Sequence, residues 1–515
     1  MELPLSIDQA SVVALHRQVY DAIRSAILHG RLRAGDRLPA TRVLAGQLSL
    51  SRTTVAEAYD QLQAEGYIQG KHGSGTYVAP DLPEETLQVT AGDGEQGTPA
   101  RRPVRLSQWG ERIVARDYQA LFRPPSLDEF RYDFRPHRVA QDLFPWDAWR
   151  GAAERALSSD RTRLLLYPPS AGHPELRELV AAHIRRYRAV TCSTDQIVIV
   201  NGIQQGLNLL VHLLLEPGDR VAVEDPGYPT ARLAFEARGL TVTQVPVDRD
   251  GLMVERLAGL PAHRLVHVTP SHQDPTGATL SLARRLALLE LAERTECLIL
   301  EDDYDSEFRY EGRPVESLQG LDRNGLVVYG GTFSKSVLAG LRIGFLVLPP
   351  DLVSPFVAAK SLWDSGAPML EQAILAEFMR SGDFERHIRR MRRLYRDRRN
   401  ALLTALQTCF GDRVEFGARH GGLNVLIALD LPCSEAELAM MAAGGGIALR
   451  PASPYYAVEP ARPHFLMGFA SLPEEEIAQG VRKLAAMLHQ NKMPPPRTLG
   501  SAYMAGAVTR DKEVT

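Results

Sequence analysis

The chain has 515 residues, 44% of them hydrophobic, and a formal net charge of -3, which allows several folded cores and excludes a uniformly basic nucleic-acid-binding protein. Its four cysteines lie far apart, without the spacing of a metal-binding or redox motif, and we expect reduced thiols. No apolar run approaches the roughly 18 residues that span a bilayer, and the N-terminus lacks the pattern of a signal peptide. The composition therefore predicts a cytoplasmic protein without membrane contact.

Residues 11–80 have the pattern of a small DNA-binding unit. Apolar residues recur at helical spacing over residues 12–29, and a second helix is predicted from residues 38–42 to Leu48. Ser51 can cap a third helix that ends near Gly66. Two short helices joined by a tight turn predict a helix-turn-helix, whose second helix presents its first residues to base edges.

A glycine-rich segment follows the third helix. Residues 67–78 predict two short strands around a turn, a wing that would carry Lys71 and His72 toward a phosphate backbone. Residues 11–80 contain eight basic residues against five acidic ones, so this end is mildly basic. The alternative interpretation is a small helical cap whose arginines are merely solvated.

This segment resembles the winged helix-turn-helix of the GntR regulator superfamily over essentially all of residues 11–80. The resemblance implies six DNA-contacting positions, namely Arg42, Arg52, Thr53, Thr54, His72 and Gly73. Ala56 departs from the pattern, since some relatives have another basic residue there. The base preference of those relatives is therefore not transferred to this chain.

The composition changes over residues 81–130, which are rich in acids, glycine and proline and lack periodicity. This composition predicts a linker, flexible to about residue 103, that would allow more than one arrangement of the units it joins. Residues 491–515 have the composition of a disordered tail.

Residues 131–490 alternate short apolar runs with amphipathic helices, such as those predicted at residues 204–215, 284–294 and 371–379. The apolar runs occupy residues 196–200, 220–224, 265–269, 297–301, 327–329 and 343–348. This alternation predicts an α/β fold with a mostly parallel sheet covered on both faces, whose ligands lie outside the carboxyl ends of the strands.

The stretch at residues 330–342 places Lys335 among hydroxyls and glycines, with Arg342 seven residues later. A lysine whose pKa is lowered by its site forms Schiff bases with aldehydes such as pyridoxal phosphate (PLP). The Thr332 hydroxyl and the Arg342 guanidinium suit a phosphate beside it. The alternative is a solvated loop lysine.

Other predicted strand ends carry further residues that could bind a cofactor. The turn at residues 201–205 opens a helix whose N-terminus can hold a phosphate, and Tyr228 offers a flat surface to an aromatic ring. The acidic residues within 301–305 follow an apolar run that is predicted to be buried, where carboxylates are costly unless a cation lies beside them. A protonated pyridinium is such a cation. A divalent-metal cluster is the less favoured alternative, because no histidine lies nearby in the sequence.

Together these motifs resemble fold-type-I PLP-dependent aminotransferases across about residues 131–490. Combined with the N-terminal segment and linker, they resemble the MocR/GabR family of bacterial transcriptional regulators over nearly the whole chain. The resemblance implies that Lys335 forms the Schiff base with PLP, that Asp302 pairs with the pyridine nitrogen, and that Tyr304 bonds to the phenolic oxygen. It further implies that Tyr228 stacks on the ring. The phosphate would be held by Gly202, Ile203, Gln204, Thr332 and Arg342. No metal is implied.

Several positions depart from these families. Asp274 stands where many aminotransferases have asparagine, and Leu466 stands where they keep the arginine that binds the substrate carboxylate. Thr230 and Pro454 occupy places where family members that read an amino-acid carboxylate have arginines. Arg450 and Arg232 lie nearby in the sequence and are the two candidate substitutes.

These observations predict a PLP-binding, DNA-binding transcriptional regulator whose aminotransferase-like domain senses PLP or an amine or amino-acid effector. The resemblance implies a homodimer, head to tail, and an operator with two half-sites. One alternative is an active PLP-dependent aminotransferase with a fused DNA-binding domain. Another is a DNA-binding protein whose large domain has lost the cofactor and serves only to dimerise.

Overall fold

The computed structural model describes most of the chain. The described residues are 5, 7–8, 11, 13–71, 75–82, 104–115, 130–159, 164–312 and 316–490. They form two compact units, one within Met1–Val104 and the other within Arg105–Thr515. The predicted C-terminal tail and the predicted DNA contacts His72 and Gly73 lie outside the described residues.

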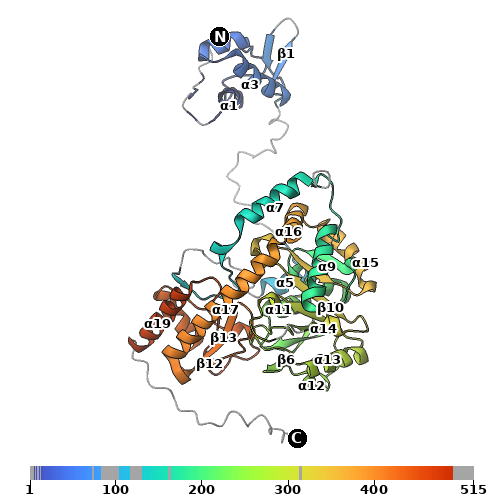
Figure 1. Ribbon diagram of the computed structural model, residues 1–515. Helices are drawn as coiled ribbons and strands as arrows, with labels where there is room; N and C mark the ends of the chain where they lie inside the picture. Colours follow the sequence, from blue (N-terminus) through green and yellow to red (C-terminus); the bar gives the residue numbers. More distant parts are fainter. Residues whose placement is uncertain are drawn as a thin grey trace. The chain divides into compact units, whose positions relative to one another are not determined.

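The first unit consists of three helices and a hairpin (Figure 1). Its elements are α1 (Leu15–Leu28), α2 (Thr41–Leu48), α3 (Arg52–Ala64), β1 (Ile68–Lys71) and β2 (Gly75–Val78). Fully buried apolar side chains from the three helices, including Val19, Leu44 and Val55, meet in one core. β1 and β2 pair antiparallel, as predicted for the wing.

The helix-turn-helix in this unit follows from local chemistry. α2 ends at Ser49, which adopts a left-handed φ of 55° and turns the chain toward α3. The Ser51 hydroxyl then accepts a hydrogen bond from the Thr54 amide at 3.1 Å, which satisfies one of the free amides at the start of α3. The predicted turn and cap are therefore present.

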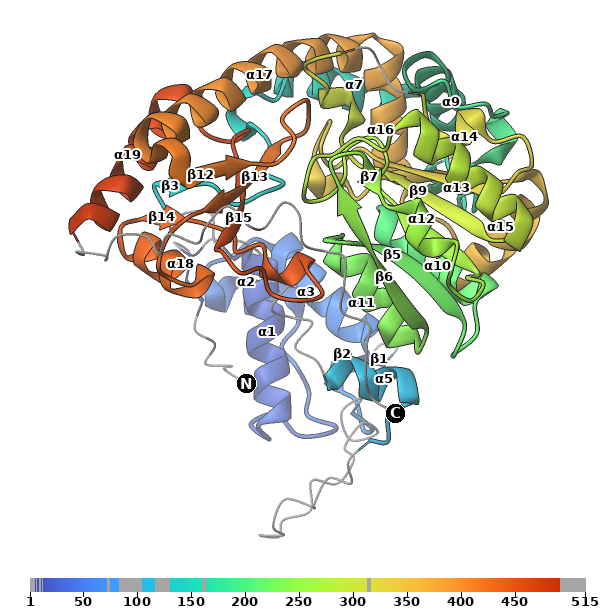
Figure 2. The ribbon, with the colours of Figure 1, turned by 90° about the horizontal axis from the view of Figure 1, so that it is seen from below.

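The second unit is built on an eight-stranded sheet (Figure 2). In spatial order its strands are β4 (Ile197–Val200), β11 (Gly344–Val347), β10 (Val327–Thr332), β9 (Leu298–Asp303), β8 (Leu265–Val268), β5 (Arg220–Asp225), β6 (Thr241–Asp248) and β7 (Gly251–Leu252). The pairs from β10 to β6 are parallel, whereas β11 is antiparallel to both its neighbours and β7 is antiparallel to β6.

Helices cover both faces of this sheet because side chains alternate along each strand. On β4, Val198 and Val200 pack in one core while Ile197 and Ile199 pack in another. The first face is covered by α10 (Ile203–Leu214), α11 (Pro229–Arg238) and α15 (Pro350–Asp364). The opposite face is covered by α9 (Pro174–Arg188), α12 (Val254–Leu257), α13 (Leu282–Thr295), α14 (Leu318–Leu321) and α16 (Met369–Arg380).

A smaller lobe of the second unit contains a three-stranded antiparallel sheet and a parallel strand pair. The sheet strands are β12 (Val414–Phe416), β13 (Asn424–Leu429) and β15 (His464–Gly468), and the pair is β3 (Tyr132–Asp133) with β14 (Ile447–Ala448). The lobe's helices are α17 (Asp383–Phe410), α18 (Glu435–Gly444) and α19 (Glu474–Gln490). Figures 1 and 2 show the long helix α17 running beside α19 and on toward α16.

The predicted fold class is confirmed, and the six predicted apolar runs correspond to β4, β5, β8, β9, β10 and β11. The strands β6 and β7 were not predicted, because most β6 side chains are partly exposed and its sequence is not a continuous apolar run. Helix α7 (Trp146–Ser159) adds to the second unit, and α5 (Gln108–Val114) forms within the predicted linker and packs against α11. Among the described residues, no helix is long and apolar enough to cross a membrane.

Candidate functional site

The carboxyl ends of the parallel strands surround a cavity of about 190 Å³. All nine residues predicted from the resemblance to hold a cofactor line this cavity: Gly202, Ile203, Gln204, Tyr228, Asp302, Tyr304, Thr332, Lys335 and Arg342. They come from separate strand ends, which parallel pairing places at one edge of the sheet. The predicted motifs therefore meet at one place.

Lys335 follows β10 and is partly buried in the cavity wall. Burial lowers the pKa of its amine, assisted by Arg342 and opposed by the carboxylates of Asp274, Asp305 and Asp302. A lowered pKa increases the fraction of neutral amine, which is the nucleophilic form. The site therefore suits reaction with an aldehyde.

Asp302 lies near the end of β9 and is 4% exposed. Its Oδ1 has no hydrogen-bond partner among the described residues, and its Oδ2 lies 3.5 Å from His267 Nε2. A buried carboxylate oxygen without a partner is costly, unless a cationic or proton-donating group occupies the space beside it. A protonated pyridine nitrogen fits this requirement. In the described part of the chain, no cluster of three or more metal-ligating side chains exists.

Another part of the cavity lining has the features of an anion site. Gly202 precedes α10 with a left-handed φ of 75°, and a Cβ at this position would lie only 2.5 Å from Arg342 Nη2. The amides at the start of α10 and the Arg342 guanidinium therefore converge on a space that a side chain would fill. The Thr332 hydroxyl lies 3.0 Å from the Ser334 hydroxyl and adds hydrogen-bonding capacity.

Tyr228 forms one wall of the cavity. Its ring lies 6.5 Å from the His267 ring, centroid to centroid, with an interplanar angle of 26°. Burial raises the pKa of Tyr228 to about 12, so the hydroxyl is neutral at physiological pH. The adjoining backbone is fixed by the Gly227 amide, which donates to the Tyr455 carbonyl at 2.9 Å.

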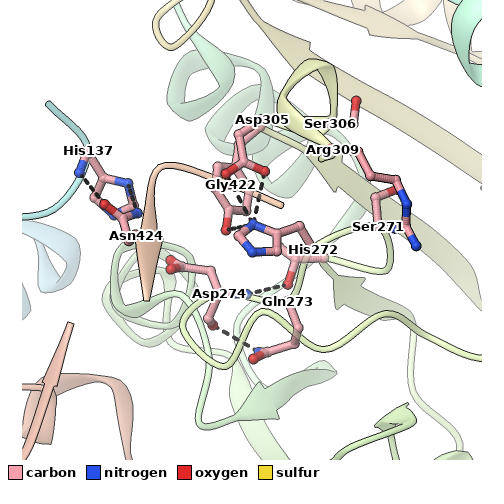
Figure 3. A network of polar contacts seen from close by, with 12 residues as sticks. His137, Ser271, His272, Gln273, Asp274, Asp305, Ser306, Arg309, Gly422 and Asn424 are labelled. Atoms are coloured by element: carbon pink, nitrogen blue, oxygen red, sulfur yellow. Dashed lines mark hydrogen bonds and ion pairs between the residues drawn. The ribbon is translucent and has the colours of Figure 1, made fainter. Parts of the chain in front are cut away.

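A buried polar network surrounds His272 (Figure 3). His272 Nδ1 lies 3.1 Å from both carboxylate oxygens of Asp305 and 3.0 Å from the Tyr304 hydroxyl. Although burial opposes it, the Asp305 carboxylate raises the pKa of His272. Sequence reasoning missed this pairing, because His272 and Asp305 lie on different strand ends and only the tertiary fold brings them together.

Asp274, the first departure noted in the sequence, lies in the same network and is 3% exposed. Burial and then the Asp305 charge raise its pKa to about 7, while His272 and Lys335 act in the opposite direction. Its amide donates to the Thr269 hydroxyl at 3.1 Å. The carboxyl of Asp274 is thus a proton-holding group near neutral pH, which asparagine could not be.

His137 also lines the cavity and was not predicted. It precedes α7 in the sequence and reaches the site through the N-terminal segment of the second unit, with a left-handed φ of 66°. This conformation is uncommon for a residue other than glycine. No sequence motif surrounds His137, so the sequence alone offered no signal for it.

A larger cavity of about 300 Å³ lies elsewhere in the second unit, between α9, the start of α17 and β10. It shares only Thr332 with the nine predicted residues. One of its walls contains the buried ion pair of Arg188 Nε with Asp303 Oδ2, at 2.7 Å. These two charged groups neutralise each other in the wall of this second cavity.

The predicted DNA contacts lie on α2 and α3 of the first unit. Arg42, Arg52 and Thr53 are exposed, whereas Thr54 is partly buried and its hydroxyl lies 2.8 Å from that of Ser51. Neither Arg42 nor Arg52 has an ion pair or a side-chain hydrogen bond with any residue in the described ranges. Both guanidinium groups are therefore available to an external anion.

Comparison with known families assigns both units. Residues 15–78 match the family described as bacterial regulatory proteins, gntR family, and residues 138–484 match aminotransferase class I and II. Among solved structures, the kynurenine aminotransferase of Pyrococcus horikoshii has a TM-score of 0.67 at 27% identity, and covers 75% of this chain and 100% of its own. The α-aminoadipate aminotransferase LysN of Thermus thermophilus has a TM-score of 0.67 at 29% identity, with 75% and 97% covered.

Curated relatives share both units in the same order. The probable rhizopine catabolism regulatory protein MocR of Rhizobium meliloti is 35% identical over 93% of this chain and 95% of its own length. The pyridoxine biosynthesis regulator PdxR of Corynebacterium glutamicum is 30% identical over 92% and 96%. This chain therefore belongs to the MocR/GabR family of transcriptional regulators, in which a GntR-type helix-turn-helix domain is joined to a class I and II aminotransferase domain.

Proposed function

We propose that this protein is a PLP-binding transcriptional regulator that binds DNA through its N-terminal unit and senses PLP, or an amine or amino-acid effector, in the cavity around Lys335. The observation that carries the proposal is the buried Oδ1 of Asp302, which has no partner among the described residues, together with the position of Asp302 in the lining of the same cavity as Lys335. An electron-withdrawing pyridinium needs such a carboxylate, and an aldehyde needs such an amine.

PLP, when bound, supplies an aldehyde that bonds reversibly to primary amines and a ring that withdraws electrons. Lys335 would provide the amine, and Asp302 would hold a proton at the ring nitrogen. Tyr304 would donate its hydroxyl to the phenolic oxygen, and Tyr228 would pack against the ring face. The amides of Ile203 and Gln204 at the helix N-terminus would hold the phosphate together with Arg342 and Thr332, and Gly202 leaves the necessary space.

DNA binding is assigned to the first residues of α3 and to α2. Arg52 and Arg42 contact phosphates, while Thr53 and Thr54 lie at the end of α3 that can reach base edges. We further propose a homodimer, head to tail, so that two such units read two half-sites. Residues 11–80 are the DNA-binding domain, residues 81–130 join it to the cofactor domain at 131–490, and α5 within the joining segment belongs to the second compact unit.

Coupling between the two units requires a ligand that binds two arrangements of the protein with unequal affinity. In this proposal, the binding of a ligand at Lys335, or its displacement from Lys335, shifts the equilibrium between these arrangements. Tight binding alone would change nothing, because only the difference in affinity shifts the equilibrium.

An active aminotransferase with a fused DNA-binding domain is the second candidate, and the intact cavity favours it. The substrate-carboxylate arginine of aminotransferases is nevertheless replaced by Leu466, which is 1% exposed in an apolar cluster. Turnover of an amino donor with a keto acceptor, measured with the purified protein, distinguishes the two candidates. We expect no appreciable turnover, because the protein acts as a regulator and not as an enzyme.

The first experiment is the visible absorption spectrum of the purified protein with PLP, before and after borohydride, with Lys335→Ala as a control. We expect a band that borohydride abolishes in the wild type and that the variant lacks. Operator fragments selected from genomic DNA would then be bound with and without PLP. Absence of a lysine-dependent band would overturn the cofactor site, whereas a band without any effect on DNA affinity would overturn sensing.

A further inference from the structure

Asp274 carries a buried carboxyl group that has no partner among the described residues. The residue lines the cofactor cavity and is 3% exposed. Neither of its carboxylate oxygens makes a hydrogen bond or an ion pair with any residue that the structure describes. A buried carboxylate is costly unless a cation or a hydrogen-bond donor lies beside it. The cavity next to this carboxyl therefore suits a cationic group.

The loop around Asp274 is held in place by hydrogen bonds that leave the carboxyl unused. The Asp274 amide donates to the Thr269 hydroxyl at 3.1 Å, and that hydroxyl donates to Glu224 Oε2 at 2.5 Å. The Gln273 side-chain amide donates to the Asp274 carbonyl at 2.9 Å and to the Pro226 carbonyl at 2.8 Å. These bonds fix the backbone of Asp274, so its carboxyl is positioned before any ligand arrives.

The charged residues of the cavity lining can be matched with the parts of the cofactor. Among the described residues they are Asp274, Asp302, Lys335 and Arg342. In the proposed cofactor site, Asp302 faces the pyridine nitrogen, Lys335 meets the aldehyde and Arg342 meets the phosphate. Tyr304 serves the phenolic oxygen, which a carboxylate would repel. Asp274 is therefore the one charged group of this set that the cofactor leaves without a counterpart.

Lys335 does not neutralise Asp274, although both residues line the cavity. The two side chains form no ion pair in the described part of the chain. Burial lowers the pKa of the Lys335 amine even though Asp274 opposes the change, so the ammonium form is disfavoured. Burial also lowers the pKa of His137, on the cavity wall, well below its ordinary value. The counterion of Asp274 must therefore come from a ligand.

The cavity lining offers little to a carboxylate. Leu466, at the place of the aminotransferase arginine, is 1% exposed within an apolar cluster. Arg232 is engaged by two backbone carbonyls of residues 454–456. Arg342 is the only arginine among the described residues that line the cavity, and it belongs to the anion site beside α10. The lining thus favours an effector with a second positive charge over one with a carboxylate.

We propose that Asp274 binds a second positive charge on the effector, and that the effector is a diamine or polyamine without a carboxylate. This inference rests on the proposed function, because the effector and the cofactor share the cavity around Lys335. A cation beside Asp274 keeps its carboxyl ionised, in the way that the Lys335 charge lowers the pKa of Asp274. The Asp305 carboxylate, which raises that pKa, attracts the same cation.

The test compares stable ligands that differ in one end group. The N-(5'-phosphopyridoxyl) derivatives of 1,2-diaminoethane and 1,4-diaminobutane end in an ammonium, and those of propylamine and pentylamine end in a methyl at the same position. Calorimetry at pH 8, above the pKa of about 7 of Asp274, measures their affinities for the full-length, cofactor-free protein. We expect at least one ammonium compound to bind about tenfold more tightly than its methyl counterpart, as a charge-assisted hydrogen bond predicts. The derivative of β-alanine, which ends in a carboxylate, should bind more weakly than that of propylamine.

Three variants locate the preference. Asp274→Asn keeps the size of the side chain and removes its charge, so it should reduce the preference to less than about twofold. It should still bind the methyl compounds, which shows that the variant is folded. Asp274→Glu keeps the charge and should retain part of the preference. Asp351→Asn removes an exposed carboxylate of α15 and should retain all of it.

The outcomes separate this subsite from the cofactor site. If both methyl compounds bind the wild type as tightly as their ammonium counterparts, or if the preference survives Asp274→Asn, the cation subsite is overturned while the cofactor site stands. Failure of every compound to bind the wild type would refute the cofactor site itself, and the subsite with it.

Discussion

The DNA-binding unit and the cofactor cavity hold their charges in opposite ways. Arg42 and Arg52 are exposed on two successive helices, so they attract phosphates through water and are sensitive to salt. Lys335, Asp302 and Asp274 come from distant parts of the chain and meet in one cavity. There, burial changes the pKa of Lys335 and of Asp274. Local sequence suffices for the first kind of site, whereas the second depends on the assembled sheet.

The largest effect is expected in the buried cofactor cavity. Asp302→Asn removes the charge that faces the pyridine nitrogen, and we expect PLP to bind about tenfold to a hundredfold more weakly. Titration of the visible band with PLP measures the affinity. Asp351→Asn, which removes an exposed carboxylate from the first turn of α15, is the matched control and should bind PLP as the wild type does. Equal affinity in both variants would mean that Asp302 does not face the ring.

A smaller effect is expected at the exposed arginines of the DNA-binding unit. Arg52→Ala should weaken operator binding about tenfold and reduce the slope of log affinity against log salt by about 1, with PLP binding unchanged. Fluorescence anisotropy over a range of salt concentrations measures both quantities. Arg17→Ala is the control, because Arg17 lies on α1 and pairs with Asp21 at 3.3 Å. If Arg52→Ala also abolished PLP binding, the separation into two sites would be wrong.

The third prediction concerns pH. The pKa of Asp274 is about 7 in the folded protein and about 4 in an unfolded chain. Between these values the folded state retains a proton that the unfolded state has released. The free energy of unfolding should therefore fall as the pH rises, by up to about 1.4 kcal/mol per pH unit.

Asp274→Asn should flatten this dependence in the cofactor-free protein. Urea denaturation at several pH values between 4 and 8 gives the slope for the wild type and the variant. Asp351→Asn again serves as the control and should retain the wild-type slope. Parallel curves for Asp274→Asn and the wild type would show that Asp274 is ionised throughout this range.

The smallest effect is expected at the cap of α3. Ser51→Ala removes the hydroxyl that accepts from the Thr54 amide and should destabilise this helix by about 1 kcal/mol. Amide hydrogen exchange in the full-length protein reports the change in α3, whereas Ser51→Asp should preserve protection because it can also cap the helix. Unchanged protection in Ser51→Ala would show that the core around Val55 alone holds α3 in place.

Much of the fold was predictable because its signals are local. Six buried strands read as continuous apolar runs, and the helix-turn-helix followed from helical periodicity and the cap at Ser51. β6 escaped prediction because its partly exposed residues do not form such a run. The antiparallel small sheet of β12, β13 and β15 also escaped prediction.

The sequence by itself determined the two-unit organisation, the α/β class, and the set of residues that resemble a PLP site, since each depends on short motifs and periodicity. Only the tertiary structure decided how these residues act together. It placed His137 in the cavity and paired His272 with Asp305. It also engaged Arg232 while leaving Arg450 without a partner among the described residues. The physical reason is that burial and pairing depend on neighbours from distant parts of the chain, which no local pattern encodes.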